Sequence, residues 1–196
     1  MGNHNLLWLG GIHGVGKTST INGVVSGLPP TVRRIYLGRM FWDAAKLQGK
    51  RWDHLIHEEN LIETESYVTE GVLSMLSQYN LVIDAHFCIY IDNKILPGFH
   101  QENLRRIISA NPHSGLVHLI AHPNTISQRR KDSQKAYKNY PTIGELSEIE
   151  RELADSKIYF KNFATFFSEN NIAVIDSSVN SLEQVIAAVR RVYDSL

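Results

Sequence analysis

The residues with the clearest chemical meaning form a short stretch near the N-terminus. Residues 11–18 read Gly-Ile-His-Gly-Val-Gly-Lys-Thr and fit the phosphate-binding pattern Gly-x-x-x-x-Gly-Lys-Ser/Thr. Its glycines allow backbone N–H groups to point inward, and the positive end of a following helix would add to the attraction for an anion. We therefore expect a site for nucleotide phosphates that is lined by Gly11, His13, Gly14, Val15, Gly16, Lys17, Thr18 and Ser19.

Two side chains of this stretch would act on the phosphates directly. Lys17 would contact the outer phosphates as a point charge and would stabilise a transferring phosphoryl group. The Thr18 hydroxyl would ligate a Mg²⁺ ion that bridges those phosphates, so ATP and Mg²⁺ are the expected cofactors. The alternative, a plain glycine turn, is disfavoured because a strand-like run precedes the stretch and a helical one follows it.

A second polar signal follows a short apolar run at residues 81–83. Asp84 and His86 come where that run ends, and the carboxyl ends of parallel strands face the crevice in which α/β proteins bind ligands. Asp84 is therefore a candidate to hold Mg²⁺ through water or to orient the acceptor of a phosphoryl group; it could instead cap a turn. His86 is a weaker candidate for contact with the acceptor. The nine histidines show no spacing typical of a zinc site.

Several cations lie outside these two motifs. The polar, basic segment 128–142 predicts a lid that would exclude water from the reaction, with Arg129 as a catalytic cation and Lys135 in contact with the substrate. The alternative is a solvated helix face. Arg39 and Arg51 follow the second strand-like run and could bind an anionic group of the acceptor, or they could be ordinary surface residues.

The elements that must position these residues can be read from the apolar pattern. Helical periodicity separates five short apolar runs of strand length, and this alternation predicts an α/β fold with a five-stranded parallel sheet and helices on both faces. The expected strands are Leu6–Leu9, Val32–Leu37, Leu81–Ile83, Leu116–Ala121 and Ile172–Ile175. The expected helix breakers are Pro29-Pro30 and Asn111-Pro112, the expected helix cap is Ser181, and the aromatic stripe Phe160, Phe163 and Phe167 is expected to pack in the core.

Length and composition limit the remaining options. A chain of 196 residues fits one domain, here 1–196 with the lid inside it. Lys plus Arg equals Asp plus Glu at 20 each, which argues against nucleic acid or an anionic membrane surface as a partner. The single cysteine, Cys88, cannot form an internal disulfide, and the N-terminus lacks a secretory pattern, so we expect a cytoplasmic protein. All apolar runs are far shorter than the roughly 20 residues of a membrane-spanning helix.

With these motifs in order, the chain resembles the archaeal-type adenylate kinases, a branch of the nucleoside monophosphate kinases, over nearly its whole length. The resemblance rests on residues 11–18, Val-Ile-Asp-Ala-His at 82–86, Leu-Pro-Gly at 96–98 and Ser-Gln-Arg-Arg-Lys-Asp at 127–132. It implies a three-layer P-loop kinase fold in which the Asp84 strand lies beside the phosphate-loop strand. It also implies Mg-ATP as donor, a nucleoside monophosphate as acceptor, and homo-oligomers.

Three positions depart from the pattern of that branch. Tyr90 stands where the family has an arginine that binds the acceptor phosphate, so Tyr90 becomes a candidate substrate contact. Arg39 follows Gly38 where the family has Gly-Asp, and Lys135 replaces the second lid arginine at a shifted spacing. A lysine cannot supply the planar fork of hydrogen bonds that an arginine offers to a phosphate. The donor half of the site therefore matches the family better than the acceptor half.

Three functional hypotheses follow. The leading one is magnesium-dependent transfer of the ATP γ-phosphoryl group to a nucleoside monophosphate near Asp84 and Arg39, with Lys17 and Arg129 stabilising the transferring group. The first alternative changes the acceptor to another small molecule such as a hydroxyl compound, for which Asp84 would serve as general base. The second alternative is a nucleotide-binding switch or ATPase subunit.

Overall fold

The central sheet is built from the five apolar runs that the sequence predicts. In a computed structural model, which describes residues 4–50, 58–91, 94–136 and 144–196, these runs form parallel strands in the order β2-β3-β1-β6-β7. The strand bounds are β1 Leu6–Gly10, β2 Val32–Tyr36, β3 Asn80–Ala85, β6 Ser114–Ile120 and β7 Ile172–Asp176. Asp84 pairs in register with Leu9, so the carboxyl ends of β1 and β3 lie side by side.

Seven α-helices connect and cover these strands in the described part of the chain. Their bounds are α1 Lys17–Ser26, α2 Leu37–Leu47, α3 Glu58–Leu76, α4 Gln101–Ala110, α5 Pro123–Ala136, α6 Leu146–Ala164 and α7 Leu182–Asp194, and a short 3₁₀ helix, η2, covers Glu169–Asn171. The predicted breakers are confirmed, because α1 ends before Pro29 and α4 ends before Asn111. The predicted cap is also confirmed, since the Ser181 hydroxyl accepts a hydrogen bond from the backbone N–H of Gln184 at the start of α7.

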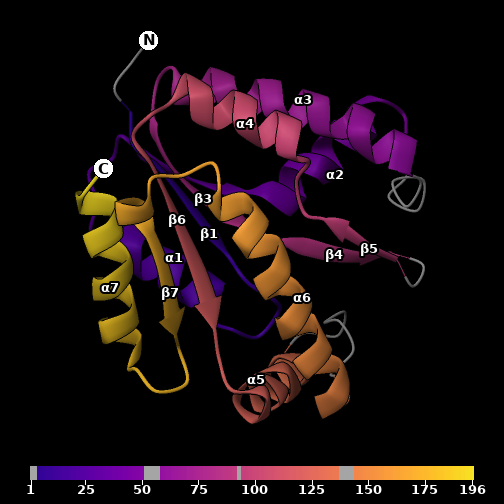
Figure 1. Ribbon diagram of the computed structural model, residues 1–196, viewed down its shortest axis with the longest axis vertical. Helices are drawn as coiled ribbons and strands as arrows, with labels where there is room; N and C mark the ends of the chain where they lie inside the picture. Colours follow the sequence, from indigo (N-terminus) through magenta and orange to yellow (C-terminus); the bar gives the residue numbers. More distant parts are fainter. Residues whose placement is uncertain (1–3, 51–57, 92–93, 137–143) are drawn as a thin grey trace.

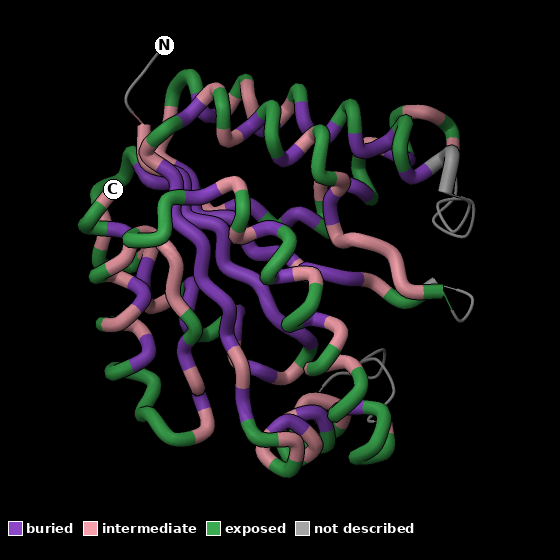
Figure 2. Tube along the Cα trace, in the orientation of Figure 1, coloured by how far each residue is buried: buried purple, intermediate pink, exposed green. Residues whose placement is uncertain are grey.

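The buried strands lie between helices (Figures 1 and 2), and their alternating side chains divide the core into two halves. Leu6 and Trp8 of β1 pack in one half with side chains of α2, α3, α4 and the C-terminal part of α6. Leu7 and Leu9 pack in the other half with side chains of α1, α5 and α7. Both faces of the sheet are therefore covered, which confirms the predicted three-layer α/β fold and explains why the strands read as continuous apolar runs.

The aromatic stripe at the end of α6 and in the turn that follows it lies in the first half of the core. Phe160, Phe163 and Phe167 are all buried there, as predicted. Phe163 meets the fully buried Trp8 edge-on, with ring centroids 6.3 Å apart. The stripe thus contributes packing to the sheet.

One element of the fold was not predicted. Residues after β3 form an antiparallel hairpin of β4 (Cys88–Ile91) and β5 (Lys94–Pro97), which projects away from the main sheet beside α6 (Figure 1). Gly98 closes it: its N–H donates to the Phe87 carbonyl, and a Cβ at this position would lie 1.8 Å from the His86 carbonyl oxygen. The Leu96-Pro97-Gly98 motif therefore holds the base of the hairpin against the end of β3.

The structure describes only part of the predicted lid and does not describe the predicted acceptor residue Arg51. The first part of the expected lid, residues 128–136, belongs to the regular helix α5, while residues 137–142 lie outside the described residues. Arg51 also lies outside them. None of the described helices is long and apolar enough to cross a membrane.

Candidate active site

The predicted phosphate-binding stretch forms a loop between β1 and α1, at the carboxyl edge of the sheet. Gly14 and Gly16 adopt φ values of 89° and 95°, in the left-handed region that other residues rarely adopt. Gly16 immediately precedes the first residue of α1, so the free N–H groups of that helix start face the loop. The sequence pattern thus has the local conformation that phosphate binding requires.

Lys17 is buried at the base of this loop. Its Nζ donates to the carbonyl oxygens of Gly11 at 2.7 Å and Ile12 at 3.0 Å, and the residue is only 8% exposed. Burial lowers the pKa of Lys17 to about 8, and the nearby Asp84 carboxylate opposes that effect. The ammonium group is thus held by two backbone carbonyls, and phosphate oxygens would be stronger partners for it.

Asp84 and Thr18 are joined through residues of β2. The Arg34 guanidinium donates to Oδ2 of Asp84 at 3.0 Å, and its Cζ lies 4.2 Å from the centre of the Tyr36 ring. The Tyr36 hydroxyl lies 2.9 Å from Thr18 Oγ1, and Tyr36 pairs in register with Asp84 on the neighbouring strand. Thr18 and Asp84 therefore both lie beside Tyr36, where Thr18 could ligate a Mg²⁺ ion directly and Asp84 could hold it through water.

The charge state of Asp84 is set by opposing effects. Burial raises its pKa above the ordinary value of an aspartate, while Lys17, Arg34 and Tyr36 act in the opposite direction. The carboxyl is 5% exposed, so its basicity depends on these few neighbours. A buried carboxylate with a raised pKa is suited to accept a proton from a substrate hydroxyl.

Two histidines border the loop as neutral groups. The rings of His13 and His86 lie 4.5 Å apart, centre to centre. Burial together with Lys17 and Arg130 lowers the pKa of His13 to about 4, and burial and Lys17 hold the pKa of His86 well below its ordinary value. Neither ring therefore carries charge at pH 7. No group of three or more His, Cys, Asp or Glu among the described residues could hold a metal ion.

Arg129 of α5 connects the loop to the end of β7. Its guanidinium donates to Oγ and the carbonyl oxygen of Ser177, at 2.9 and 2.8 Å, and to the Gly14 carbonyl at 3.4 Å. The Ser177 hydroxyl in turn donates to the Val15 carbonyl at 2.7 Å. The cation expected to act on the transferring group thus lies against the phosphate loop.

Arg130, the next residue of α5, is more deeply buried. It is 3% exposed, donates twice to the His13 carbonyl at 3.1 Å, and forms a two-point ion pair with Glu152 of α6 at 2.6 and 3.3 Å. The Arg130 guanidinium therefore holds the phosphate loop at His13 and links it to α6 through Glu152. Sequence reasoning placed Arg130 in the basic segment without giving it a role.

Of the expected acceptor contacts, His86 borders the loop, whereas Arg39, Lys135 and Tyr90 pair with other residues. Arg39 pairs with Asp43 on the exposed face of α2, and Lys135 lies 3.7 Å from Asp132 on α5. Tyr90 of the hairpin donates a hydrogen bond of 2.6 Å to Asp155 of α6. These three residues do not form a phosphate-binding cluster with one another. Side chains that the sequence did not indicate contact the loop instead, namely Tyr36, Arg130 and Ser177, while Arg34 contacts Asp84.

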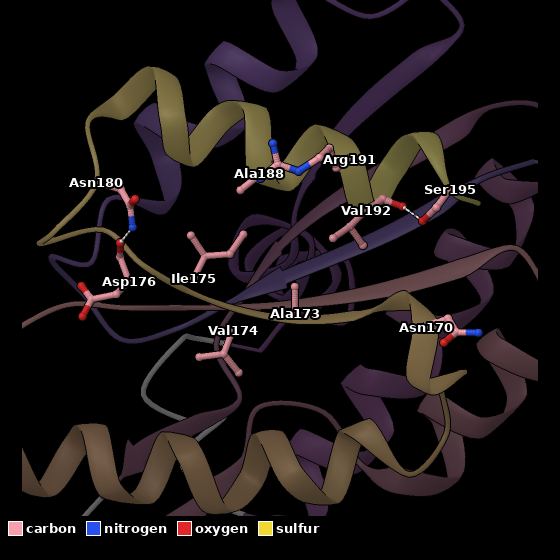
Figure 3. A pocket seen from close by; sticks show the side chains of 10 residues that line it. All are labelled: Asn170, Ala173, Val174, Ile175, Asp176, Asn180, Ala188, Arg191, Val192 and Ser195. Carbon is pink, nitrogen blue, oxygen red and sulfur yellow. Dashed lines mark hydrogen bonds between the residues drawn. The ribbon is translucent and has the colours of Figure 1, made fainter.

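A hollow on another part of the surface takes no part in this site. It lies between the edge strand β7 and α7 (Figure 3), and its lining is formed by Asn170, Ala173, Val174, Ile175, Asp176, Asn180, Ala188, Arg191, Val192 and Ser195. Asp176 directs its carboxylate to the N–H and hydroxyl of Ser178, so it is already engaged locally. The phosphate loop therefore remains the better candidate for chemistry.

Comparison by sequence finds no matching family model and no matching curated protein. Comparison by structure finds shikimate kinase from Bacteroides thetaiotaomicron, 17% identical with a TM-score of 0.58 over 97% of both chains. It also finds a sugar kinase from Janibacter sp., 14% identical with a TM-score of 0.59 over 97% of this chain and 95% of that one. A third is the tunicamycin resistance protein from Deinococcus radiodurans, 18% identical with a TM-score of 0.55 over 96% and 94%.

These likenesses extend over nearly the full length of each chain. They bear out the expected kinase-type α/β fold, whereas none of the three named neighbours is an adenylate kinase of the archaeal branch. At 14–18% identity they establish architecture only. The chain therefore has the fold of the P-loop kinases.

Proposed function

We propose that this protein transfers the γ-phosphoryl group of ATP to a hydroxyl group of a small molecule. The observation that carries the proposal is the burial of Lys17 and Asp84 together, at the carboxyl ends of the adjacent strands β1 and β3. A cation at the base of a phosphate loop and a carboxylate beside it are the groups that phosphoryl transfer to a hydroxyl needs. The kinase fold supports this reading.

In this proposal the donor half of the site binds Mg-ATP. The backbone N–H groups of the loop and the Lys17 ammonium group would hold the outer phosphates, and Lys17 would exchange its present carbonyl partners for phosphate oxygens. Thr18 directly, and Asp84 through water, would hold Mg²⁺, which when bound neutralises charge on the phosphates. Arg129 would exchange its bonds to Ser177 for the transferring group.

The acceptor half of the reaction follows from Asp84. Arg34 engages Oδ2 of this carboxylate, and we assign the other oxygen to the hydroxyl of the acceptor. The hydroxyl oxygen would form a bond to the γ-phosphorus while the bond from that phosphorus to the β–γ bridging oxygen breaks. The proton of the hydroxyl would pass to Asp84, and ADP would leave.

A hydroxyl acceptor suits this site better than the nucleoside monophosphate that the resemblance implied. An acceptor phosphate requires cations and no base, yet the arginine position of that branch holds Tyr90, which is bonded to Asp155. The structural neighbours named as shikimate kinase and sugar kinase point the same way, because shikimate and sugars carry hydroxyl groups. Nucleoside monophosphates are therefore included as one of the acceptor sets in the test.

The test is a product analysis. Purified protein with Mg-ATP would be incubated with three separate acceptor sets: sugars and polyols, hydroxylated carboxylic acids including shikimate, and the nucleoside monophosphates. ³¹P NMR separates a new phosphate ester from a new diphosphate. We expect an ester in one of the first two sets; a diphosphate formed only in the third set would replace our acceptor with a nucleotide.

A further inference from the structure

The Tyr36 hydroxyl contacts one of the two groups to which we assign the metal, and Tyr36 is the strand neighbour of the other. The hydroxyl is 2.9 Å from Thr18 Oγ1, and Tyr36 pairs in register with Asp84 on the neighbouring strand β3. When the phenol donates in the bond to Thr18, it occupies a lone pair of the threonine oxygen. Tyr36 thus engages the threonine oxygen that would ligate the metal.

A bound Mg²⁺ ion would make a competing demand on Thr18. It requires near-octahedral oxygen ligands at about 2.0–2.1 Å and usually keeps several of its waters. The ion would need the Thr18 oxygen that the phenol now contacts, and its waters would need the space beside that oxygen. The hydrogen bond to Tyr36 and the bond to the metal therefore compete.

Tyr36 is also placed so that it can leave this position. Its side chain is 45% exposed, so rotation toward solvent uncovers little additional apolar surface. It is the last residue of β2 and directly precedes α2, whose first turn carries Arg39. A change at Tyr36 therefore occurs at the junction between β2 and α2, where its hydroxyl contacts Thr18 of the phosphate loop.

We propose that Tyr36 gates the metal site: without Mg-nucleotide its hydroxyl is hydrogen-bonded to Thr18 Oγ1, and it is displaced when Mg-nucleotide binds. Tyr36 is then a positioning residue whose displacement accompanies metal entry. This inference rests on the proposed nucleotide site. It predicts that the phenol weakens binding of the metal complex and leaves metal-free nucleotide unaffected.

The experiment compares ADP affinity with and without Mg²⁺ by titration calorimetry, in the full chain and in Tyr36→Phe. The substitution removes only the hydroxyl, and circular dichroism checks that the variant is folded. We expect Mg-ADP to bind Tyr36→Phe roughly 3- to 10-fold more tightly than the unaltered chain, since one competing hydrogen bond is lost. Metal-free ADP should bind both equally. Tyr67→Phe, an exposed tyrosine on α3, is the matched control and should change neither affinity.

A second measurement follows Tyr36 in the unaltered sequence. Protein labelled with 3-fluorotyrosine would be observed by ¹⁹F NMR, and the Tyr36 signal is the one missing from Tyr36→Phe. That signal should move with Mg-ADP and stay in place with metal-free ADP. Equal or weaker Mg-ADP binding by Tyr36→Phe, or an unmoved signal, would overturn the gate alone. If the unaltered chain binds no nucleotide, the gate and the proposed function both fail.

Discussion

Arg34 on β2 donates a hydrogen bond of 3.0 Å to the buried carboxylate of Asp84 on β3. The two strands are neighbours in the parallel sheet, with Arg34 paired to Val82 in register. Arg34 is thus the one cation from β2 that this geometry places on Asp84. It lowers the pKa of a carboxyl that burial raises.

Removing this guanidinium should affect stability and reactivity together. In Arg34→Met the Asp84 carboxylate keeps only Lys17 as a nearby cation, so we expect the free energy of unfolding at pH 7 to fall by about 1–3 kcal/mol. The pKa of Asp84 should rise further, because an ion-pair partner is lost. As the base must be ionised, the rising limb of the pH–rate profile should move to higher pH.

The neighbouring arginine provides the control for that variant. Arg33 is exposed on the same strand and stacks on Tyr79, with its Cζ 4.9 Å from the ring centre. Urea unfolding of Arg33→Met should show a loss of at most about 1 kcal/mol, and its pH–rate profile should match the unaltered protein. Equal shifts in the two variants would show that Arg34 does not act through Asp84.

A second prediction separates the two adjacent arginines of α5. Arg129→Ala should lower the rate of phosphoryl transfer by about 100-fold while the Kd for ATP changes only a few-fold, because this cation is assigned to the transferring group. Steady-state rates and calorimetric titration measure the two effects. A Kd that rises in proportion to the loss of rate would assign Arg129 to ground-state nucleotide binding.

Arg130 should behave in the opposite manner. Its buried guanidinium holds the His13 carbonyl and Glu152, so Arg130→Ala leaves both without their partner. We expect a loss of about 2–4 kcal/mol in the free energy of unfolding and weaker ATP binding, both measured by ligand-dependent urea unfolding. A stable Arg130→Ala that binds ATP normally would contradict the supporting role.

The core contains a histidine that should make stability depend on pH. His118 on β6 is 1% exposed, its Nε2 lies 3.0 Å from Ser156 Oγ, and burial lowers its pKa to about 4. A histidine with a depressed folded-state pKa favours folding above its unfolded value of about 6.5, and that contribution is lost as pH falls toward 4. Between pH 7 and pH 5 this one group should remove about 1–2 kcal/mol of stability.

The measurement is urea unfolding at both pH values for two glutamine variants. His118→Gln cannot be protonated, so its stability should fall less between pH 7 and pH 5 than that of the unaltered chain. His122→Gln changes an exposed ring and is expected to keep the original slope. Identical slopes in all three proteins would show that His118 has the same pKa in the folded and the unfolded state, which would contradict this prediction.

The strands and the phosphate loop could be predicted because their signals are local. Burial on both faces makes β1, β3 and β6 nearly continuous apolar runs, and the loop pattern fixes both its own glycines and its flanking elements. The β4–β5 hairpin was not predicted because each strand has only four residues. Such short runs show no clear alternation.

The partners of the site residues depend instead on strand order and helix packing. The pairing of Arg34 with Asp84 arises because β2 lies beside β3, and these residues are separated by 50 positions in the sequence. The only local hint was a pair of arginines, Arg33 and Arg34, within an expected buried strand. Likewise, the bond between Tyr90 and Asp155 requires the hairpin to meet α6. These distant contacts are not encoded in any short pattern.

Lys17 gives a further prediction because burial lowers its pKa to about 8. Bound phosphates should raise that pKa again, so at pH 9 nucleotide binding should be accompanied by proton uptake and should weaken as pH rises. Calorimetry of ADP binding in two buffers of different ionisation enthalpy counts the protons taken up. A binding reaction at pH 9 without proton uptake would mean that Lys17 is already fully charged.

The most direct test of the central claim is the rate of ADP formation from Mg-ATP with the best acceptor, in the unaltered protein and in Lys17→Ala. Loss of the buried cation removes the contact with the outer phosphates, and we expect turnover to fall by about 1000-fold or more. Such a loss, in a variant that remains folded, would confirm that the loop performs phosphoryl transfer. Substantial acceptor-dependent turnover by Lys17→Ala would contradict the assignment of the active site.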